Sequence, residues 1–214
     1  MTEPLTLTSL PIFPLHTVLF PGGYLPLRVF EPRYRMMVQC CREEGAPFGV
    51  VTLLSGHEVR ELDADLPAES FHTLGTMASI DALEPMRSGL ELIHCSGKDR
   101  FRIQRSRQLT SGLWVADVTL IAVDTPTLVP PDLAHTVTAL QHVLNKLPMR
   151  SLEGVGTPQF NDCGWVANRW CELFPLDIAH QLQLLSVESP LLRLELVTDA
   201  LEQAGIVPHP KINI

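Results

Sequence analysis

Short apolar runs separated by turn residues dominate the first part of the chain. Ile12 to Leu15 and Thr17 to Phe20 are such runs, and Pro21-Gly22 suits positions i+1 and i+2 of a type II turn. Tyr24 to Phe30 then alternates apolar and other residues, which predicts a strand, and Pro26 favours a sheet edge or bulge. This stretch therefore predicts strand, turn and strand.

The hydrophobic period changes at Glu31-Pro32. Apolar or aromatic residues then recur at spacings of three and four, at Tyr34, Met37, Val38 and Cys41. Proline is tolerated in a first helical turn, and Gly45 is a typical stop. We expect one amphipathic helix from about Pro32 to Glu43.

Further β-rich runs follow the helix. They are Phe48 to Leu54, Thr73 to Ile80, Leu90 to Ser96, Arg100 to Arg105 and Leu113 to Val123. Turns are expected at Glu84 to Gly89 and at Gly97-Lys98-Asp99, and the acidic segment Glu58 to Glu69 is expected to be a surface loop, either a lid or a simple connection. Strands at such short intervals predict a mainly antiparallel sheet that curls into a barrel.

The second part of the chain has helical periods and follows a proline-rich connection, Asp124 to Pro131. We expect a β-barrel domain at 1–126 with one main helix and a small helical bundle at 127–214, which together form an α+β protein. The first two helices are expected to start at Asp132 and at Asn161 or Asp162. A third should start at Pro175 and cover Leu176 to Leu185, and a fourth should start at Ser189-Pro190 and end at Gly205. Ser151 to Pro158 is expected to be a loop.

Composition and charge narrow the function classes. The 214 residues are 45% hydrophobic, and 24 acidic against 16 basic residues give a net charge of −8, which disfavours nucleic acid as a partner. The first residues lack the basic region of a secretory signal, so we expect a cytoplasmic protein. Pro4 to Leu27 carries no Asp, Glu, Lys or Arg, but its prolines exclude a membrane helix.

The motifs of nucleotide and peptidase chemistry are missing. Gly97-Lys98 lacks the earlier glycine and the following hydroxyl of a phosphate-binding loop, because Leu92 and Asp99 stand there. A Ser-Lys peptidase needs a desolvated lysine, and Lys98, Lys146 and Lys211 do not have that setting. We therefore expect no enzymatic activity and no cofactor.

Metal sites are not indicated either. His135 and His142 are two helical turns apart, and the five cysteines show no C-x-x-C spacing, so we expect no metal and mostly buried free thiols. Glu31, Arg33 and Arg35 could form a polar site at the strand–helix junction. Alternatively, Glu31 caps or complements the helix N-terminus while one of the arginines pairs with it. Trp165 and Trp170 could anchor an apolar peptide or pack in a core.

Several motifs of the sequence resemble those of a known family. The run PIFPLHTVLFPGGYLPLRVFEPRY at Pro11 to Tyr34, with FGVV at Phe48 and LGTMA at Leu74, resembles the amino-terminal, substrate-binding domain of Lon proteases. GKDRFRI from Gly97 and WVADV from Trp114 are similar to later strands of that domain. The likeness extends over nearly the whole chain.

The resemblance implies a barrel of the PUA-like type, a following helical subdomain, and recognition of unfolded or otherwise marked proteins. The ATPase and peptidase domains of a Lon protease are not in this sequence, so we expect a non-enzymatic module that binds exposed apolar segments of unfolded or damaged proteins. A protease acting in trans is a further expected partner. The expected binding residues, at the strand–helix junction or the barrel–bundle interface, are Phe30, Tyr34, Trp165 and Trp170.

Three alternatives stay open. PUA-like barrels often bind RNA, although the acidic balance opposes this here. An adaptor or regulatory subunit of a protease would bind one defined protein rather than many clients. A hydrolase would need a nucleophile and a base close together.

Overall fold

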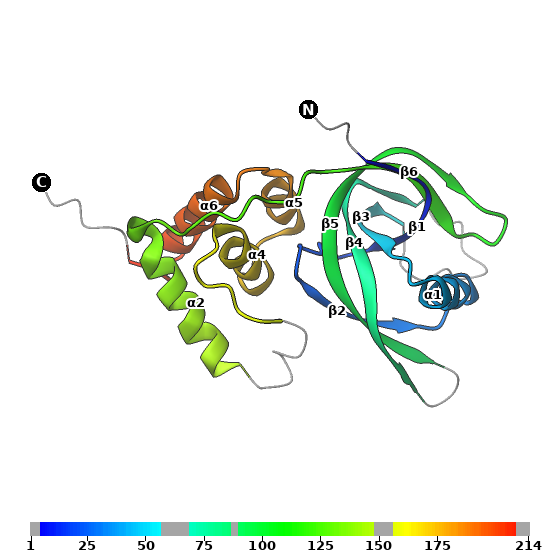
Figure 1. The fold of residues 1–214 in the computed structure, drawn as a ribbon, viewed down its shortest axis with the longest axis horizontal. Coiled ribbons are helices and arrows are strands. Elements are labelled where there is room, and N and C mark those ends of the chain that lie inside the picture. The colour runs from blue at the N-terminus through cyan, green and yellow to red at the C-terminus, as the bar shows by residue number, and fades with distance from the viewer. Residues whose placement is uncertain (1–4, 57–68, 87–89, 148–155, 209–214) are drawn as a thin grey trace, which may run out of the picture. The chain divides into compact units, whose positions relative to one another are not determined.

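The computed structural model describes residues 5–56, 69–86, 90–147 and 156–208. The chain forms two compact units, Met1–Val123 and Asp124–Ile214. The first contains the sheet and one helix and the second contains the remaining helices (Figure 1), so the predicted α+β class is confirmed. Among the described residues, no helix is long and apolar enough to cross a membrane.

Some expected features fall partly or wholly outside the described residues. The acidic segment does so except for Glu69, and so do the end of the expected turn at 84–89 and most of the expected loop at 151–158.

The first unit is a closed, mainly antiparallel sheet, as predicted. Its strands are β1 (Thr6–Leu15), β2 (Tyr24–Val29), β3 (Phe48–Ser55), β4 (Ser70–Pro85), β5 (Glu91–Gln108) and β6 (Trp114–Leu120). Their order is β2-β5-β4-β3-β1-β6, and an additional pairing of β5 with β6 closes the barrel. Among the strand pairs of the described residues, only β1 and β3 run parallel. β2 stands at the end of this order, which is the edge position that Pro26 favours.

Strand β5 is continuous where the sequence predicted a turn. Gly97 pairs with Ala78 and Arg100 pairs with Thr76, so Lys98 and Asp99 together face a single residue of β4. This is a β-bulge, which bends a strand without ending it. The predicted break at Gly97-Lys98-Asp99 is therefore wrong. The bend lets the first part of β5 pair with β2 and the last part with β6.

Gly97 is needed because a turn of the opening stretch packs directly on it. The amide of Gly23 donates to the carbonyl of Phe20 over 2.9 Å and Gly22 has φ +71°, as the predicted turn at Pro21-Gly22 requires. Gly22 and Gly23 each exchange one backbone hydrogen bond of 2.8 Å with Gly97. A Cβ at position 97 would lie 2.2 Å from the carbonyl oxygen of Phe20.

Buried side chains form two clusters, and β1 contributes to both. Leu10 and Ile12 face a cluster that includes Phe101. Phe13 and Leu15 point to the opposite side, because successive residues of a strand alternate. β1 also pairs with β6, where Thr6 lies opposite Thr119. The first strand of the unit is thus held by the last.

Helix α1 (Pro32–Glu44) covers the second cluster. Its buried residues are Arg33, Tyr34, Met37, Val38 and Cys41, and it ends at Gly45. Four of these five are the positions that the hydrophobic period predicted, and the fifth is a buried arginine that the period did not predict.

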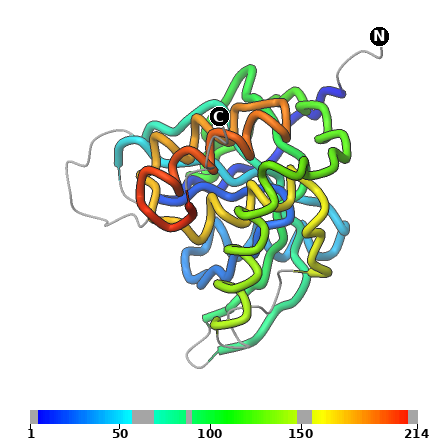
Figure 2. The backbone as a smooth tube through the Cα atoms, turned by 90° about the vertical axis from the view of Figure 1, so that its left-hand side faces the viewer, coloured from blue at the N-terminus to red at the C-terminus, as the bar shows by residue number. Residues whose placement is uncertain are grey.

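The helical unit contains a short 3-10 turn η2 (Pro131–Leu133) and helices α2 (Ala134–Lys146), α4 (Cys163–Leu173), α5 (Ile178–Ser186) and α6 (Pro190–Gln203). α4 packs against α6 and α2, and α5 packs against α6 (Figure 2). The predicted caps Asp162 and Ser189 accept hydrogen bonds from backbone amides of the first helical turns. Asp132 is not a cap, because it lies inside the 3-10 turn. The third helix starts later than predicted, at Ile178, because the side chain of Asp177 caps it by accepting a hydrogen bond from the amide of His180.

Arg193 of α6 connects several segments of the helical unit through hydrogen bonds. Its guanidinium is buried and uses all five N–H groups. These groups donate to both carboxylate oxygens of Asp124, to the Asn168 side chain, and to the carbonyls of Leu184 and Val187. Asp124 therefore belongs with the helices of the second unit.

Gly97→Ala should destabilise the barrel strongly. The new methyl group would meet a backbone carbonyl that cannot move without breaking the turn, and we expect a loss of about 3 kcal/mol in the free energy of unfolding, measured by urea denaturation. Ser96→Ala, at the neighbouring half-buried position, is the control; it removes only a surface hydrogen bond to Asp81 and should change the free energy of unfolding by less than about 1 kcal/mol. Equal effects of the two substitutions would contradict the role assigned to Gly97.

Candidate functional site

A cavity lies at the junction where β2 leads into α1. Its volume is about 250 Å³. The lining residues come from β1, from β2 and from the start of α1, and they are Phe13, Leu15, Pro26, Leu27, Arg28, Val29, Phe30, Glu31 and Tyr34. The lining is mostly apolar with a few polar groups, as is typical of sites that bind ligands through apolar contact.

Phe30 and Tyr34, two of the residues predicted from sequence, both line this cavity. Phe30 is 45% exposed, while Val29 beside it is buried. Tyr34 is only 3% exposed, and its ring stacks on Phe13 with centroids 3.8 Å apart. Phe30 is thus available to a ligand, and Tyr34 forms part of the floor.

The start of α1 is held by a buried charge network around Arg33. Its side chain lies 3.0 Å from the carboxylate of Glu31 and 3.4 Å from that of Glu69. It also donates to the carbonyl of Gly112 over 3.0 Å. The indole N–H of Trp114 donates to the other carboxylate oxygen of Glu69 over 2.6 Å. One guanidinium therefore joins α1, the residue before β4 and the turn between β5 and β6.

Burial works against the charge of Arg33, but the neighbouring phenol and the two carboxylates outweigh it, so the pKa of Arg33 is raised. The guanidinium also lies 4.5 Å from the centre of the Tyr34 ring. Glu31 stands at the N-cap position, but its side chain makes no capping hydrogen bond. Of the two interpretations of Glu31 and its neighbouring arginines, the structure shows the ion pair, formed between Glu31 and Arg33 at the start of α1.

The two tryptophans lie in the helical unit. Trp170 is 2% exposed, and its indole N–H donates to the carbonyl of Thr136. Trp165 is half-buried and packs edge-on against Phe160, with ring centroids 5.2 Å apart. Trp170 is thus part of a core, and neither ring lines the junction cavity.

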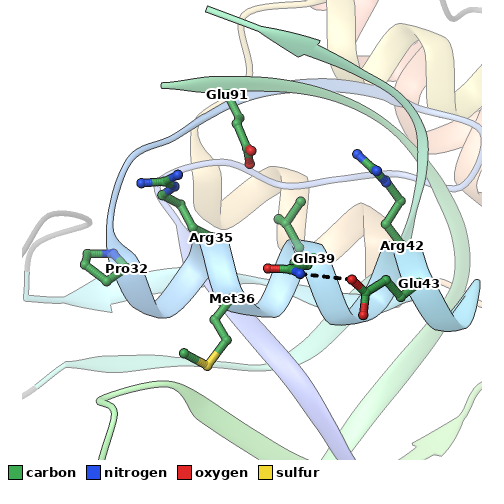
Figure 3. A pocket seen from close by; sticks show the side chains of 8 residues that line it. Pro32, Arg35, Met36, Gln39, Arg42, Glu43 and Glu91 are labelled. Atoms are coloured by element: carbon green, nitrogen blue, oxygen red, sulfur yellow. Dashed lines mark hydrogen bonds between the residues drawn. The ribbon is translucent and has the colours of Figure 1, made fainter. Parts of the chain in front are cut away.

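A second hollow, of about 450 Å³, lies along one flank of α1. Its lining residues are Pro32, Arg35, Met36, Val38, Gln39, Arg42, Glu43 and Glu91 (Figure 3). Among these residues, only Arg35 was a candidate for a polar site from the sequence. The seven-residue spacing of Arg35 and Arg42, two turns on one side of a helix, was the signal available in the sequence. Glu91 could not be found in this way, since the fold brings it there from β5.

One group of titratable side chains lies elsewhere on the barrel. The Tyr24 hydroxyl and Nδ1 of His94 share a hydrogen bond, and Nε2 of His94 lies 3.4 Å from Glu84. His94 is opposite Pro26 in the β2–β5 register. This side-chain hydrogen bond therefore links β2 to β5 beside Pro26.

The cysteines have a structural role. Cys41, Cys95, Cys163 and Cys171 are buried, and Cys40 is exposed. Burial raises the pKa of Cys41 and Cys163 to about 11 and that of Cys95 and Cys171 to about 12, so these thiols are inert at neutral pH. Within the described residues, no group of three or more His, Cys, Asp or Glu could hold a metal ion.

Comparison with known proteins decides the family. The model of the family described as "ATP-dependent protease La (LON) substrate-binding domain" matches residues 9–203. This chain belongs to the Lon substrate-binding domain family. The resemblance seen in the opening stretch is thereby confirmed.

Individual Lon relatives agree with this. The chain is similar to the Lon protease of Flavobacterium johnsoniae, with 33% identity over 96 residues, which are 44% of this chain and 11% of that protease. A Lon N-terminal domain protein from Xanthomonas campestris, known from a crystal structure, has 32% identity and a TM-score of 0.71, with 90% of this chain and 98% of that chain covered. The N-terminal domain of Lon protease from the Mycobacterium avium complex shares the fold, with a TM-score of 0.57, 18% identity and coverage of 89% and 96%.

Replacing Arg33 should destabilise the junction. Arg33→Met would leave two carboxylates and a carbonyl without their buried cation, and we expect a loss of about 3 kcal/mol or more in the free energy of unfolding at neutral pH. Arg105→Met is the control, because Arg105 is exposed and its carboxylate partner is 3.7 Å away. Arg105→Met should change the free energy of unfolding by less than about 1 kcal/mol. Urea denaturation followed by circular dichroism compares the two, and similar losses would refute the role of Arg33.

Thiol labelling should separate the cysteines into two groups. A disulfide reagent added to the folded protein at neutral pH should modify Cys40 promptly and the four buried thiols only after denaturation. Cys40→Ser should remove the prompt phase. Rapid modification of more than one thiol in the folded protein would contradict the buried positions.

Proposed function

We propose that this protein is a non-enzymatic recognition module that binds exposed apolar segments of unfolded or damaged proteins at the junction cavity. The observation that supports this most directly is Phe30, an exposed aromatic ring at the mouth of an apolar cavity. Burying a phenylalanine side chain is worth about 1.5–3 kcal/mol, so one such contact contributes substantially to peptide affinity.

The surroundings of Phe30 suit a recognition role. Val29 beside it is buried, and Arg33, three residues further on, is fixed by carboxylates and a carbonyl from distant parts of the barrel. A ring presented from a rigid frame loses little conformational entropy when a ligand covers it. Family membership supports the same function, because the family is described by substrate binding.

The alternatives differ in the partner that they require. RNA binding is opposed by the net charge of −8. An adaptor or regulatory subunit would deliver clients to a protease in trans, and a pull-down would then recover one defined complex rather than many unfolded chains.

Phe30→Ala should weaken peptide binding about tenfold or more. The loss follows from the apolar area that the ring would bury, since a factor of ten corresponds to about 1.4 kcal/mol. The measurement is fluorescence anisotropy with a short labelled peptide rich in Leu and Phe, and a reduced, alkylated protein that cannot refold serves as competitor.

Leu54→Ala is the matched control for this experiment. Leu54 is 57% exposed on β3 and does not line the junction cavity. It should leave affinity unchanged. Equal losses in both variants, or none in Phe30→Ala, would contradict the placement of the site. Absence of binding by the wild-type protein to the peptide and to the unfolded competitor would contradict the function itself.

A further inference from the structure

Strand β2 has a strand neighbour on one side only. Among the described residues it pairs with β5 alone, and it stands at one end of the strand order. Its residues from Pro26 to Val29 line the junction cavity together with Phe30. The cavity therefore lies along an edge strand, and such an edge is a place where an extended segment of another chain can add as a further strand.

The hydrogen bonds of β5 show which backbone groups of β2 point to this free edge. In an antiparallel pair, opposite residues alternate between those that exchange backbone hydrogen bonds and those that do not. On the β4 side of β5, the amide of Met86 donates to the carbonyl of Leu90 over 2.9 Å, so the next bonded pair in this register is Glu84 with Leu92. The backbone groups of Leu92 thus point to β4, and those of Arg28, which lies opposite Leu92 on β2, point away from β5.

The start of β2 leads to the same assignment. The amide of Gly97 donates to the carbonyl of Gly23 over 2.8 Å, and counting from this bonded pair places the backbone groups of Pro26 and Arg28 on the outer side. A proline is tolerated in an edge strand where its missing N–H would face away from the sheet. Outside the β2–β5 pairing, neither Pro26 nor Arg28 forms a backbone hydrogen bond among the described residues. The free edge thus offers the carbonyl of Pro26 and both the amide and the carbonyl of Arg28.

The side chains of β2 alternate between the interior and the solvent. Leu27 and Val29 are buried and line the cavity from the core side, whereas Pro26 and Arg28 are exposed. Residues that lie opposite each other on neighbouring strands point to the same face of a sheet. In a strand added beside β2, every second side chain would therefore point toward the buried part of the cavity lining, and the others would point to solvent.

From this geometry we propose that a client segment binds as an extended strand added to the free edge of β2, with every second side chain directed into the junction cavity. This inference rests on the proposed function of the cavity and specifies its client: an unfolded segment with apolar side chains at alternate positions. Backbone groups are common to all sequences, so hydrogen bonds to Pro26 and Arg28 hold clients that are otherwise unrelated. Folded proteins are excluded, because their backbone groups are already paired.

The experiment uses a labelled peptide with Leu or Phe at every second position and two derivatives with N-methyl groups. One derivative is methylated on the apolar residues and the other on the residues between them. Since the amides of a strand point alternately to its two sides, only one derivative loses hydrogen bonds to β2. We expect that derivative to bind the wild-type protein about tenfold or more weakly than the parent peptide, and the other to bind like the parent, as measured by fluorescence anisotropy.

Arg28→Pro tests the same edge from the side of the protein. It removes the outward amide, while the hydrogen bonds to β5 are made by the neighbouring residues of β2. Arg28→Ala is the matched variant, because it loses the same side chain and keeps the amide. We expect the proline variant to bind the parent peptide about fivefold or more weakly than the alanine variant, with circular dichroism showing that both are folded. The methylated peptides test the inference even if the proline variant does not fold.

Two results would overturn the inference: equal affinities of the wild-type protein for the two methylated derivatives, or equal affinities of the folded proline and alanine variants for the parent peptide. Either result would leave apolar recognition intact if the parent peptide still binds the wild type and loses affinity on Phe30→Ala. Failure of the parent peptide to bind the wild-type protein would instead reject the proposed function.

Discussion

The candidate site depends on one buried cation. Arg33 lies in the first turn of α1, a place where a helix dipole favours negative charge, and it is removed from water. It is tolerated because Glu31 and Glu69 compensate the charge and Gly112 accepts a further hydrogen bond. These partners come from three parts of the barrel, so the direction in which the chain leaves β2 is fixed from several sides. Phe30, between β2 and this buried network, is exposed.

The helical unit uses the same physical solution in a different place. Arg193 satisfies all its donors with a carboxylate, an amide and two carbonyls, and it thereby attaches the start of the unit to three helices. Hydrophobic periodicity could identify neither arginine, because arginine counts as a polar residue in such a pattern even when its aliphatic stem is buried.

What the sequence predicted well was local. The turn at Pro21-Gly22, the extent of α1 and the caps at Asp162 and Ser189 each depend on a few neighbouring residues, and each was found in the structure. The errors arose where distant residues decide. Gly97 was taken for a turn residue, but its small size is required by a segment more than seventy positions earlier. In the same way, sequence could name Phe30 and Tyr34 but could not say which would be exposed, since that depends on Phe13 stacking over one of them.

The pairing of β1 with β6 affects how this barrel forms. Thr6 meets Thr119, so the first strand acquires one of its two neighbours only after almost the entire unit has been synthesised. Contacts between such distant residues are slow to form, because the loop they close carries a large entropic penalty. Until then the apolar residues of β1, among them Ile12 and Phe13, lack the neighbours that cover them in the finished barrel. A protein that would recognise incompletely folded chains thus passes, during its own synthesis, through a state of the kind it would bind.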